Sequence, residues 1–193
     1  DVIDFRKHCI SVEGYSARTV NRKLTSIKGL CKLAVKMERL KYNFADEVKL
    51  MKLQPLAPKK ISDSDLRKLR KEAELRAYRY SRFIRDMFII DLLSRAGLRV
   101  SEVVNLNVED LEISDRKGTI SIKNGKGSKS RKVPMSADLR NLAKDYFKQC
   151  KPKVALIIPE RGTRLTPIAV NKVIDYYSKR AGIKCSPHML RHT

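Results

Sequence analysis

Acidic residues and long apolar runs are both scarce in this sequence. Only 21 Asp and Glu residues stand against 43 Lys and Arg in 193 residues, which gives a formal net charge of +22. A charge of this size is unusual for an enzyme of small metabolites. It favours a polyanionic partner, with nucleic acid ahead of a membrane surface. Since no apolar run approaches the length of a membrane-spanning helix, the sequence predicts a nucleic-acid-binding protein without a membrane span.

Cysteines are also few, and they lie far apart. Cys9, Cys31, Cys150 and Cys185 include no C-x-x-C pair, so their spacing predicts neither a disulfide framework nor a zinc site. We expect buried thiols in a reducing cytoplasm. The 42% of hydrophobic residues is sufficient for a core, in one domain or in two small ones.

The first fifty residues predict a small helical domain. Residues 2–11 are expected to form a short helix, and Ser16 to cap a long helix that runs to about Leu40. At roughly 100° per residue, one arc of the long helix is apolar. Its members are Val20, Leu24, Ile27, Cys31 and Ala34. The opposite arc is basic and consists of Arg18, Arg22, Lys28, Lys32, Lys36 and Arg39.

This basic arc has two interpretations. Surface helices usually carry charges on their outer face, so it could simply be solvated. However, a face built for solubility would mix both signs, whereas all six charges here are positive. Asn21, Thr25 and Gly29 lie between them and keep the face slim. The pattern therefore indicates a helix that contacts DNA in a groove.

Residues 53–61 are predicted to link two domains, because Leu53–Lys60 is short, basic and contains two prolines. Residues 1–52 then form one helical domain and residues 62–193 a second. The chain begins without Met and ends within an expected helix, so we expect a fragment that is cut at both ends.

The second domain is predicted to be mostly α with a small antiparallel β-sheet. Periodicity is helical at first, alternates between polar and apolar in the middle, and becomes helical again. The expected helices are 62–75, 81–96, 101–106, 136–149, 167–181 and one that starts at 187. The expected strands are 108–113, 119–122 and 131–134.

Residues 93–102 carry the first candidate site residue. An apolar helix ends here, Gly97 is suited to a left-handed helix stop, and Arg99 stands at the start of the next helix. A guanidinium held at a helix start can make two parallel hydrogen bonds to a phosphate. In a chain with so many arginines, a solvated surface residue is the alternative.

Two further stretches point to an anion. Lys126 stands between two glycines at an expected hairpin tip, where the backbone can approach a ligand closely, although an ordinary basic turn has the same pattern. Ser186 and Pro187 form a specific helix start. His188 and Arg191 follow three residues apart, so they share a face near a helix end that favours anions.

Together these motifs resemble the tyrosine recombinase (phage integrase, Xer-like) family. The stretches that carry the resemblance are residues 96–102, 125–134 and 186–193, and they occur in the expected order. Residues 1–52 are similar to part of the family's core-binding domain, and the chain from about residue 59 to its catalytic domain. The resemblance implies that a tyrosine attacks a DNA phosphodiester, which leaves a 3′-phosphotyrosyl link and a 5′-hydroxyl, without metal or cofactor.

The resemblance also implies roles for individual residues. Arg99 and Arg191 match the two arginines that hold the phosphate. Lys126 matches the lysine that protonates the leaving 5′-oxygen, and His188 the histidine placed for proton transfer. Glu102 matches an acidic residue with a supporting role.

The family's nucleophile lies beyond the last helix of this sequence. None of the seven tyrosines matches it, so we expect the chain as given to bind DNA without cleaving it. In the family, intact proteins act as tetramers on paired DNA sites. A DNA-binding relative without catalytic activity is the alternative function, and cleavage by a topoisomerase-like route without strand exchange is a third.

Overall fold

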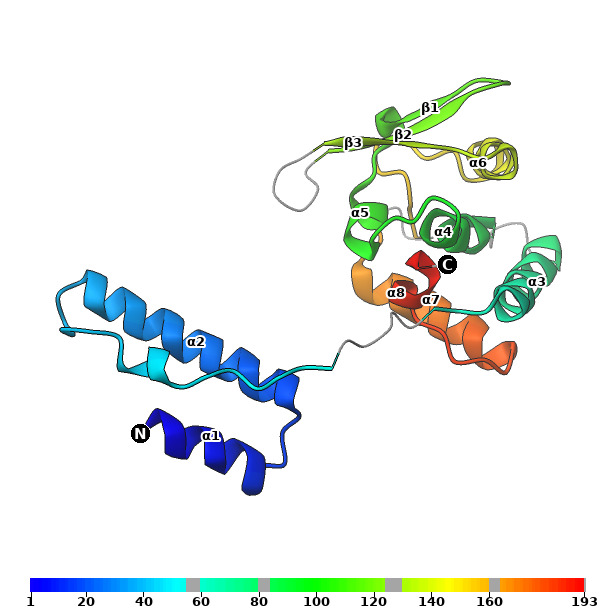
Figure 1. Ribbon diagram of the computed structural model, residues 1–193. Coiled ribbons are helices and arrows are strands. Elements are labelled where there is room, and N and C mark those ends of the chain that lie inside the picture. The colour runs from blue at the N-terminus through cyan, green and yellow to red at the C-terminus, as the bar shows by residue number, and fades with distance from the viewer. Residues whose placement is uncertain (55–59, 80–83, 124–129, 160–163, 193) are drawn as a thin grey trace. The chain divides into compact units, whose positions relative to one another are not determined.

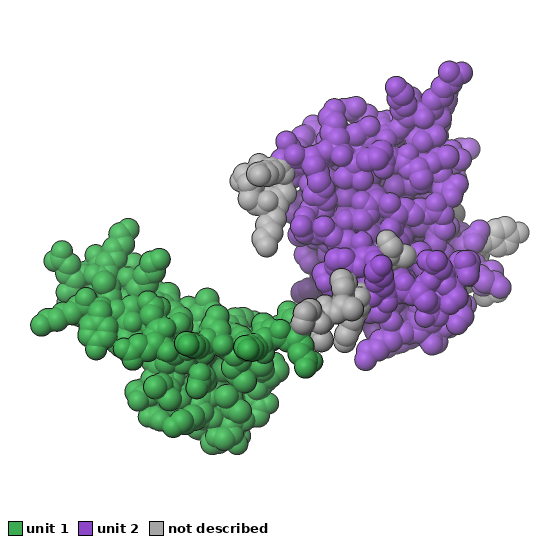
Figure 2. All heavy atoms as spheres, viewed as in Figure 1, with its two compact units in different colours: residues 1–57 green, residues 58–193 purple. Residues whose placement is uncertain are grey.

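The computed structural model describes residues 1–54, 60–79, 84–123, 130–159 and 164–192. The chain folds as two compact units, residues 1–57 and 58–193 (Figures 1 and 2). The division falls inside the segment expected to be a linker, of which residues 55–59 lie outside the described part. Helices dominate and a small antiparallel sheet accompanies them, which confirms the predicted fold class. None of the helices in the described ranges is long and apolar enough to cross a membrane.

Over its described residues, 1–54, the first unit contains two helices and one 3-10 helix. Helix α1 spans Val2–Ser11, α2 spans Ala17–Lys36, and the 3-10 helix η1 spans Phe44–Glu47. Ser16 caps α2 as predicted, since its hydroxyl accepts a hydrogen bond from the backbone N–H of Thr19. The apolar arc of α2 is its buried face. The core of the unit contains Val2, Cys9, Val20, Leu24, Cys31, Ala45 and Val48.

Helix α2 is shorter than expected. It ends at Lys36, and Glu38 then takes a left-handed backbone conformation with φ at 56°. The N–H groups of Arg39 and Leu40 both turn back to the carbonyl of Ala34. Such bonds close a helix at its C-terminus. The prediction that the helix reaches Leu40 was wrong, because no Pro or Gly in this stretch signals the end of the helix. Arg39 therefore lies beyond the end of α2.

The second unit is built around helix α4 (Ile84–Ser94), most of which is buried. Helices α3 (Asp63–Arg79), α5 (Val100–Asn105), α6 (Ala137–Cys150), α7 (Pro167–Arg180) and α8 (Pro187–Arg191) pack around it. In Figure 1, α8 and α5 lie beside α4, and both helices contact it. The central helix thereby fixes α5, whose N-cap residue is Arg99, and α8, which carries Arg191.

The sheet has three antiparallel strands in the order β1-β2-β3. They span Leu111–Ile113, Gly118–Ile122 and Arg131–Pro134, and Ile120 pairs with Leu111 on one side and Val133 on the other. The first strand is shorter than predicted, because Val108–Asp110 forms the 3-10 helix η3. The Asp110 carboxylate accepts a hydrogen bond from the backbone N–H of Asn107 at 2.9 Å and so favours this turn over a strand.

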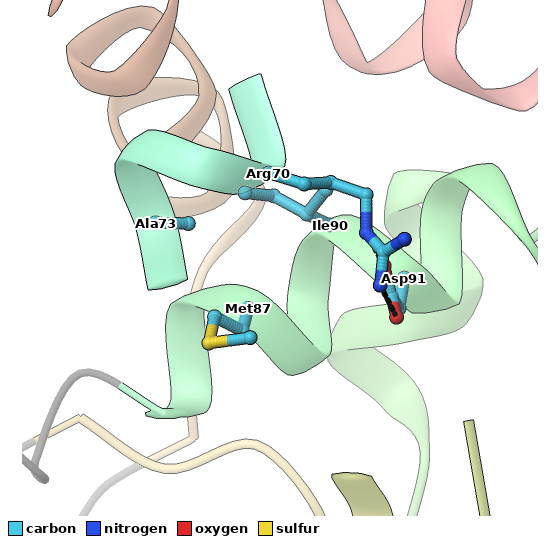
Figure 3. Close-up of a pocket in the computed structure, with 5 residues that line it drawn as sticks. All are labelled: Arg70, Ala73, Met87, Ile90 and Asp91. Atoms are coloured by element: carbon cyan, nitrogen blue, oxygen red, sulfur yellow. Dashed lines mark hydrogen bonds and ion pairs between the residues drawn. The ribbon is translucent and has the colours of Figure 1, made fainter. Parts of the chain in front are cut away.

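Asp91 connects three helices of the second unit. The guanidinium of Arg70 on α3 donates to this buried carboxylate at 3.0 Å across a small pocket, as Figure 3 shows. Arg95 lies 3.2 Å from Asp91 and also bonds Asp138 on α6 at 2.7 Å. Burial raises the pKa of Asp91, and the two arginines oppose that rise. The cluster therefore anchors α4 just before the chain turns toward Arg99.

Candidate functional site

Arg99 is positioned by a glycine turn. Gly97 has φ at 63°, a left-handed conformation, and the N–H of Leu98 bonds back to the carbonyl of Leu92 at 3.1 Å. Leu98 is fully buried, which fixes the chain between α4 and α5. Arg99 then serves as the N-cap residue of α5. Both the stop at Gly97 and the place of Arg99 agree with the sequence analysis.

Glu102 holds Arg99 in place. Its carboxylate accepts hydrogen bonds from the backbone N–H of Arg99 at 2.8 Å and from the Arg99 Nη1 at 2.7 Å. It also accepts from Nη1 and Nη2 of Arg131, both at 2.8 Å. Burial works to raise the pKa of Glu102, but the hydrogen bonds from Arg131 and Arg99 outweigh it and bring the pKa to about 2. The carboxylate is therefore charged throughout the physiological range.

Arg191 has a buried and unpaired donor. Ser186 caps α8 through the backbone N–H of Met189, and Pro187 occupies the start of the helix, as predicted. Within the described residues, Nη1 of Arg191 is buried without a hydrogen-bond partner. Loss of solvation lowers the pKa of Arg191, and the charge of Arg99 lowers it further. An unpaired buried guanidinium nitrogen is costly unless an anion binds it.

One open pocket, with a volume of about 420 Å³, brings these groups together. Its wall comes from the start of α5 and from α8, and it contains Leu98, Arg99, Val100, Ser101, Pro187, His188, Arg191 and His192. Three of the predicted site residues, Arg99, His188 and Arg191, thus line the same pocket. Glu102 lies behind Arg99, with a side chain only 7% exposed. Lys126 lies outside the described residues.

Two residues at the site were not singled out from the sequence. Arg131 on β3 pairs with Glu102, and His192 lies in the pocket wall with its Nε2 at 3.2 Å from the Nε2 of His188. Both belong to the stretches that carry the family resemblance. His192 follows His188 by four residues, a spacing that could have revealed the pair. No local signal marks Arg131, because its partner lies 29 residues away.

The basic arc of α2 is only partly free for a ligand. Arg18, Arg22, Lys32 and Lys36 are exposed on the helix. Lys28 differs from them, because its side chain is 23% exposed and its Nζ donates to the backbone carbonyl of Asp46 at 3.3 Å. The arc on the helix therefore consists of four exposed charges and one that is tied to η1.

Two tyrosines of the second unit have structural roles. The hydroxyl of Tyr146 donates to the carbonyl of Leu156 at 2.8 Å, and that of Tyr177 to Asp86 at 3.0 Å. Both side chains are fully buried. Burial raises the pKa of Tyr146 to about 12, so its hydroxyl is poorly suited to act as a nucleophile.

Comparison with known proteins identifies the family. Residues 59–193 match the phage integrase family, so the chain belongs to that family. It is 29% identical over 188 residues to tyrosine recombinase XerA of Pyrococcus furiosus, covering 95% of this chain and 61% of the relative. It is 32% identical over 196 residues to tyrosine recombinase XerC of Thermodesulfovibrio yellowstonii, covering 94% and 62%. The chain thus spans about three fifths of the length of these relatives.

Solved structures agree on the fold. The chain superposes on XerH recombinase in a post-cleavage complex with palindromic difH, with a TM-score of 0.79 at 21% identity. All of this chain and 59% of that one are covered. A lambda integrase dimer on a COC′ core site gives a TM-score of 0.75 at 14% identity, covering 98% and 54%. At these low sequence identities, the structural similarity shows a shared fold and nothing further.

Proposed function

We propose that this chain is the DNA-binding and phosphate-activating part of a site-specific DNA recombinase that works through a 3′-phosphotyrosyl intermediate. The observation that carries the proposal is the pocket that Arg99, His188 and Arg191 line together, where the buried Nη1 of Arg191 has no hydrogen-bond partner among the described residues. Family membership and the named relatives support it. Double-stranded DNA is the substrate, and the intact enzyme is proposed to act as a homotetramer on paired sites.

The pocket suits a phosphodiester in its transition state. When a tyrosine oxygen attacks phosphorus, negative charge accumulates on the two nonbridging oxygens until the bond to the 5′-oxygen breaks. Arg99 and Arg191 can each donate to these oxygens, because both line the pocket and each has guanidinium donors without a partner among the described residues. His188 lies at the same pocket and can exchange a proton with the attacking or nonbridging oxygen. Lys126 is proposed to protonate the 5′-oxygen.

Contacts away from the pocket would hold the duplex. The four exposed charges of α2 fit the phosphates that border a groove, and each neutralised phosphate releases a counterion. These contacts position DNA but do not select its sequence. Sequence preference is therefore left to base contacts and DNA shape.

The test uses the full-length product of the gene that encodes this chain. Its binding site is first selected from a random duplex library, and a nicked copy of that site is then supplied. A covalent protein–DNA adduct at a 3′-phosphate is expected, and Arg191→Lys should slow its formation roughly 100-fold, because lysine cannot make two parallel bonds.

The controls separate the candidate functions. The 193-residue chain alone should bind the selected site without forming the adduct. If the full-length product binds the site tightly and also forms no adduct, the protein is a DNA-binding relative without catalytic activity. Failure to select any site would contradict both the recombinase function and the DNA-binding function without catalysis.

A further inference from the structure

Arg131 pairs with both carboxylate oxygens of Glu102, which would otherwise be open to the full guanidinium of Arg99. Its Nη1 and Nη2 each lie 2.8 Å from a different oxygen of the Glu102 carboxylate, which is the fork geometry of a bidentate pair. The guanidinium of Arg99 reaches the same carboxylate through Nη1 alone, at 2.7 Å. Of the two arginines on Glu102, only Arg131 therefore uses its fork there.

This division leaves Arg99 free for a ligand. Within the described residues, its hydrogen bonds use only Nη1 and the backbone N–H, so Nη2 and Nε have no protein partner. The side chain is 42% exposed and borders the pocket. Without Arg131, the two oxygens of Glu102 would be able to take the fork of Arg99. The same donors could not then bind a phosphate.

Charge leads to the same conclusion. Glu102 carries one negative charge and faces the guanidinium groups of both Arg99 and Arg131. Since its charge is shared between two cations, it cannot fully neutralise Arg99. Arg99 thus keeps much of its attraction for an anion while its position stays fixed.

From these contacts we propose that Arg131 is a positioning residue, which occupies the Glu102 carboxylate and so keeps the donors of Arg99 available to the DNA phosphate. The inference rests on the proposed function and adds a residue to that site. Arg131 acts through Glu102 and needs no contact with the DNA.

Two variants separate geometry from charge. Arg131→Lys keeps the positive charge but cannot make two parallel hydrogen bonds. Lys132→Met removes a charge from the neighbouring position of β3, where Lys132 is exposed and 3.9 Å from Glu112. If Arg131 acts by positioning, Arg131→Lys should lower the single-turnover rate of adduct formation at least tenfold with DNA affinity unchanged. Lys132→Met should leave the rate within twofold.

Other outcomes would overturn the inference. A rate for Arg131→Lys equal to that of the parent protein would show that only the charge matters. An equal fall in rate for both variants would show that any change on β3 disturbs the site, without a special role for Arg131. Parallel losses of rate, affinity and melting temperature would assign Arg131 a general structural role.

A second measurement needs no DNA. In the 193-residue chain, the side-chain carboxyl signal of Glu102 is followed by carbon-13 NMR during an acid titration. Since the pKa of Glu102 is about 2, its carboxylate should remain charged down to about pH 3 in the parent chain. In Arg131→Lys, the same carboxylate should titrate at higher pH. Identical titrations would contradict the pairing itself. If the full-length product forms no adduct, the proposed function fails, yet this titration still tests whether Arg131 controls Glu102.

Discussion

At the scale of single residues, the site depends on one carboxylate that serves two arginines. Glu102 is almost completely buried, and it remains charged because Arg131 and Arg99 donate four hydrogen bonds to it. A buried charge is tolerated only when it is paired in this way. The position of Arg99 is therefore linked to the ionisation of Glu102.

That link predicts how stability depends on pH. The pKa of Glu102 is about 2 in the folded chain against an ordinary value of 4.5, so folding favours the charged form. Its contribution is complete above about pH 4.5 and is lost as the pH falls toward 2. Thermal unfolding between pH 6 and 2.5 should therefore show a smaller loss for Glu102→Gln than for the parent chain.

Glu112→Gln provides the control, because Glu112 is an exposed carboxylate on β1 and the substitution changes the charge equally. A pH profile for Glu102→Gln that matches the profile of Glu112→Gln would contradict the assignment.

At the scale of elements, the sheet packs closely against α6. A Cβ added at Gly118 on β2 would lie 2.7 Å and 2.8 Å from Cδ and Cγ of Arg140, and 3.1 Å from Cβ of Met135. Arg140 cannot easily move, since its Nη1 donates to the carbonyl of Met135 at 3.1 Å. The sheet therefore depends on a residue without a side chain at this position.

Gly118→Ala should lower the free energy of unfolding by ~1–3 kcal/mol, the usual cost of overpacking. Gly29→Ala is the control, because a Cβ at Gly29 meets nothing within 4 Å. In a helix interior this change should instead stabilise by ~0.5–1 kcal/mol. Urea unfolding measures both. A neutral Gly118→Ala would mean that β2 and α6 can separate without cost.

Elements were predictable from the sequence where local chemistry specifies them. Ser16, Gly97 and the Ser186–Pro187 pair act on their own neighbours, so the cap of α2, the end of α4 and the start of α8 were found. Contacts between residues far apart in the sequence could not be predicted from it. The end of α2 and the turn of η3 escaped as well, because hydrogen bonds rather than a Pro or Gly determine them.

The candidate site also combines features that local motifs predict with contacts that only the fold reveals. Arg99, His188 and Arg191 were identified from motifs, whereas the pairing of Arg131 with Glu102 joins residues 29 positions apart and required the fold. Lys28 is a second example. It belongs to the basic arc by helical spacing, but Asp46 binds it from a segment 18 residues away.

At the scale of the whole molecule, the proposed association with DNA should depend on net charge. The excess of 22 positive charges should make affinity for duplex DNA fall steeply with salt. Among the charges of α2, Lys32 is exposed and Lys28 is tied to Asp46. The two lysines therefore form a matched pair for measuring what a free charge contributes.

Lys32→Met should reduce the slope of log affinity against log salt by about 0.9, the value for one phosphate contact, and Lys28→Met by clearly less. Fluorescence anisotropy with a 20-base-pair duplex between 50 and 300 mM salt would measure both. Equal slopes for the two variants would mean that α2 does not distinguish free from paired charges. Binding that ignores salt would contradict a DNA-binding role altogether.

The unpaired nitrogen of Arg191 has a consequence for how this protein balances stability against activity. A buried donor without a partner among the described residues weakens the free fold, and under the proposed function a DNA phosphate would offset that cost. In urea unfolding of the 193-residue chain, Arg191→Met should then raise the free energy of unfolding by ~1 kcal/mol, and in the full-length product it should abolish adduct formation with DNA. A less stable variant would show that Arg191 already supports the fold before DNA binds. The expected gain in the free energy of unfolding would show that Arg191 is retained for activity at a cost in stability.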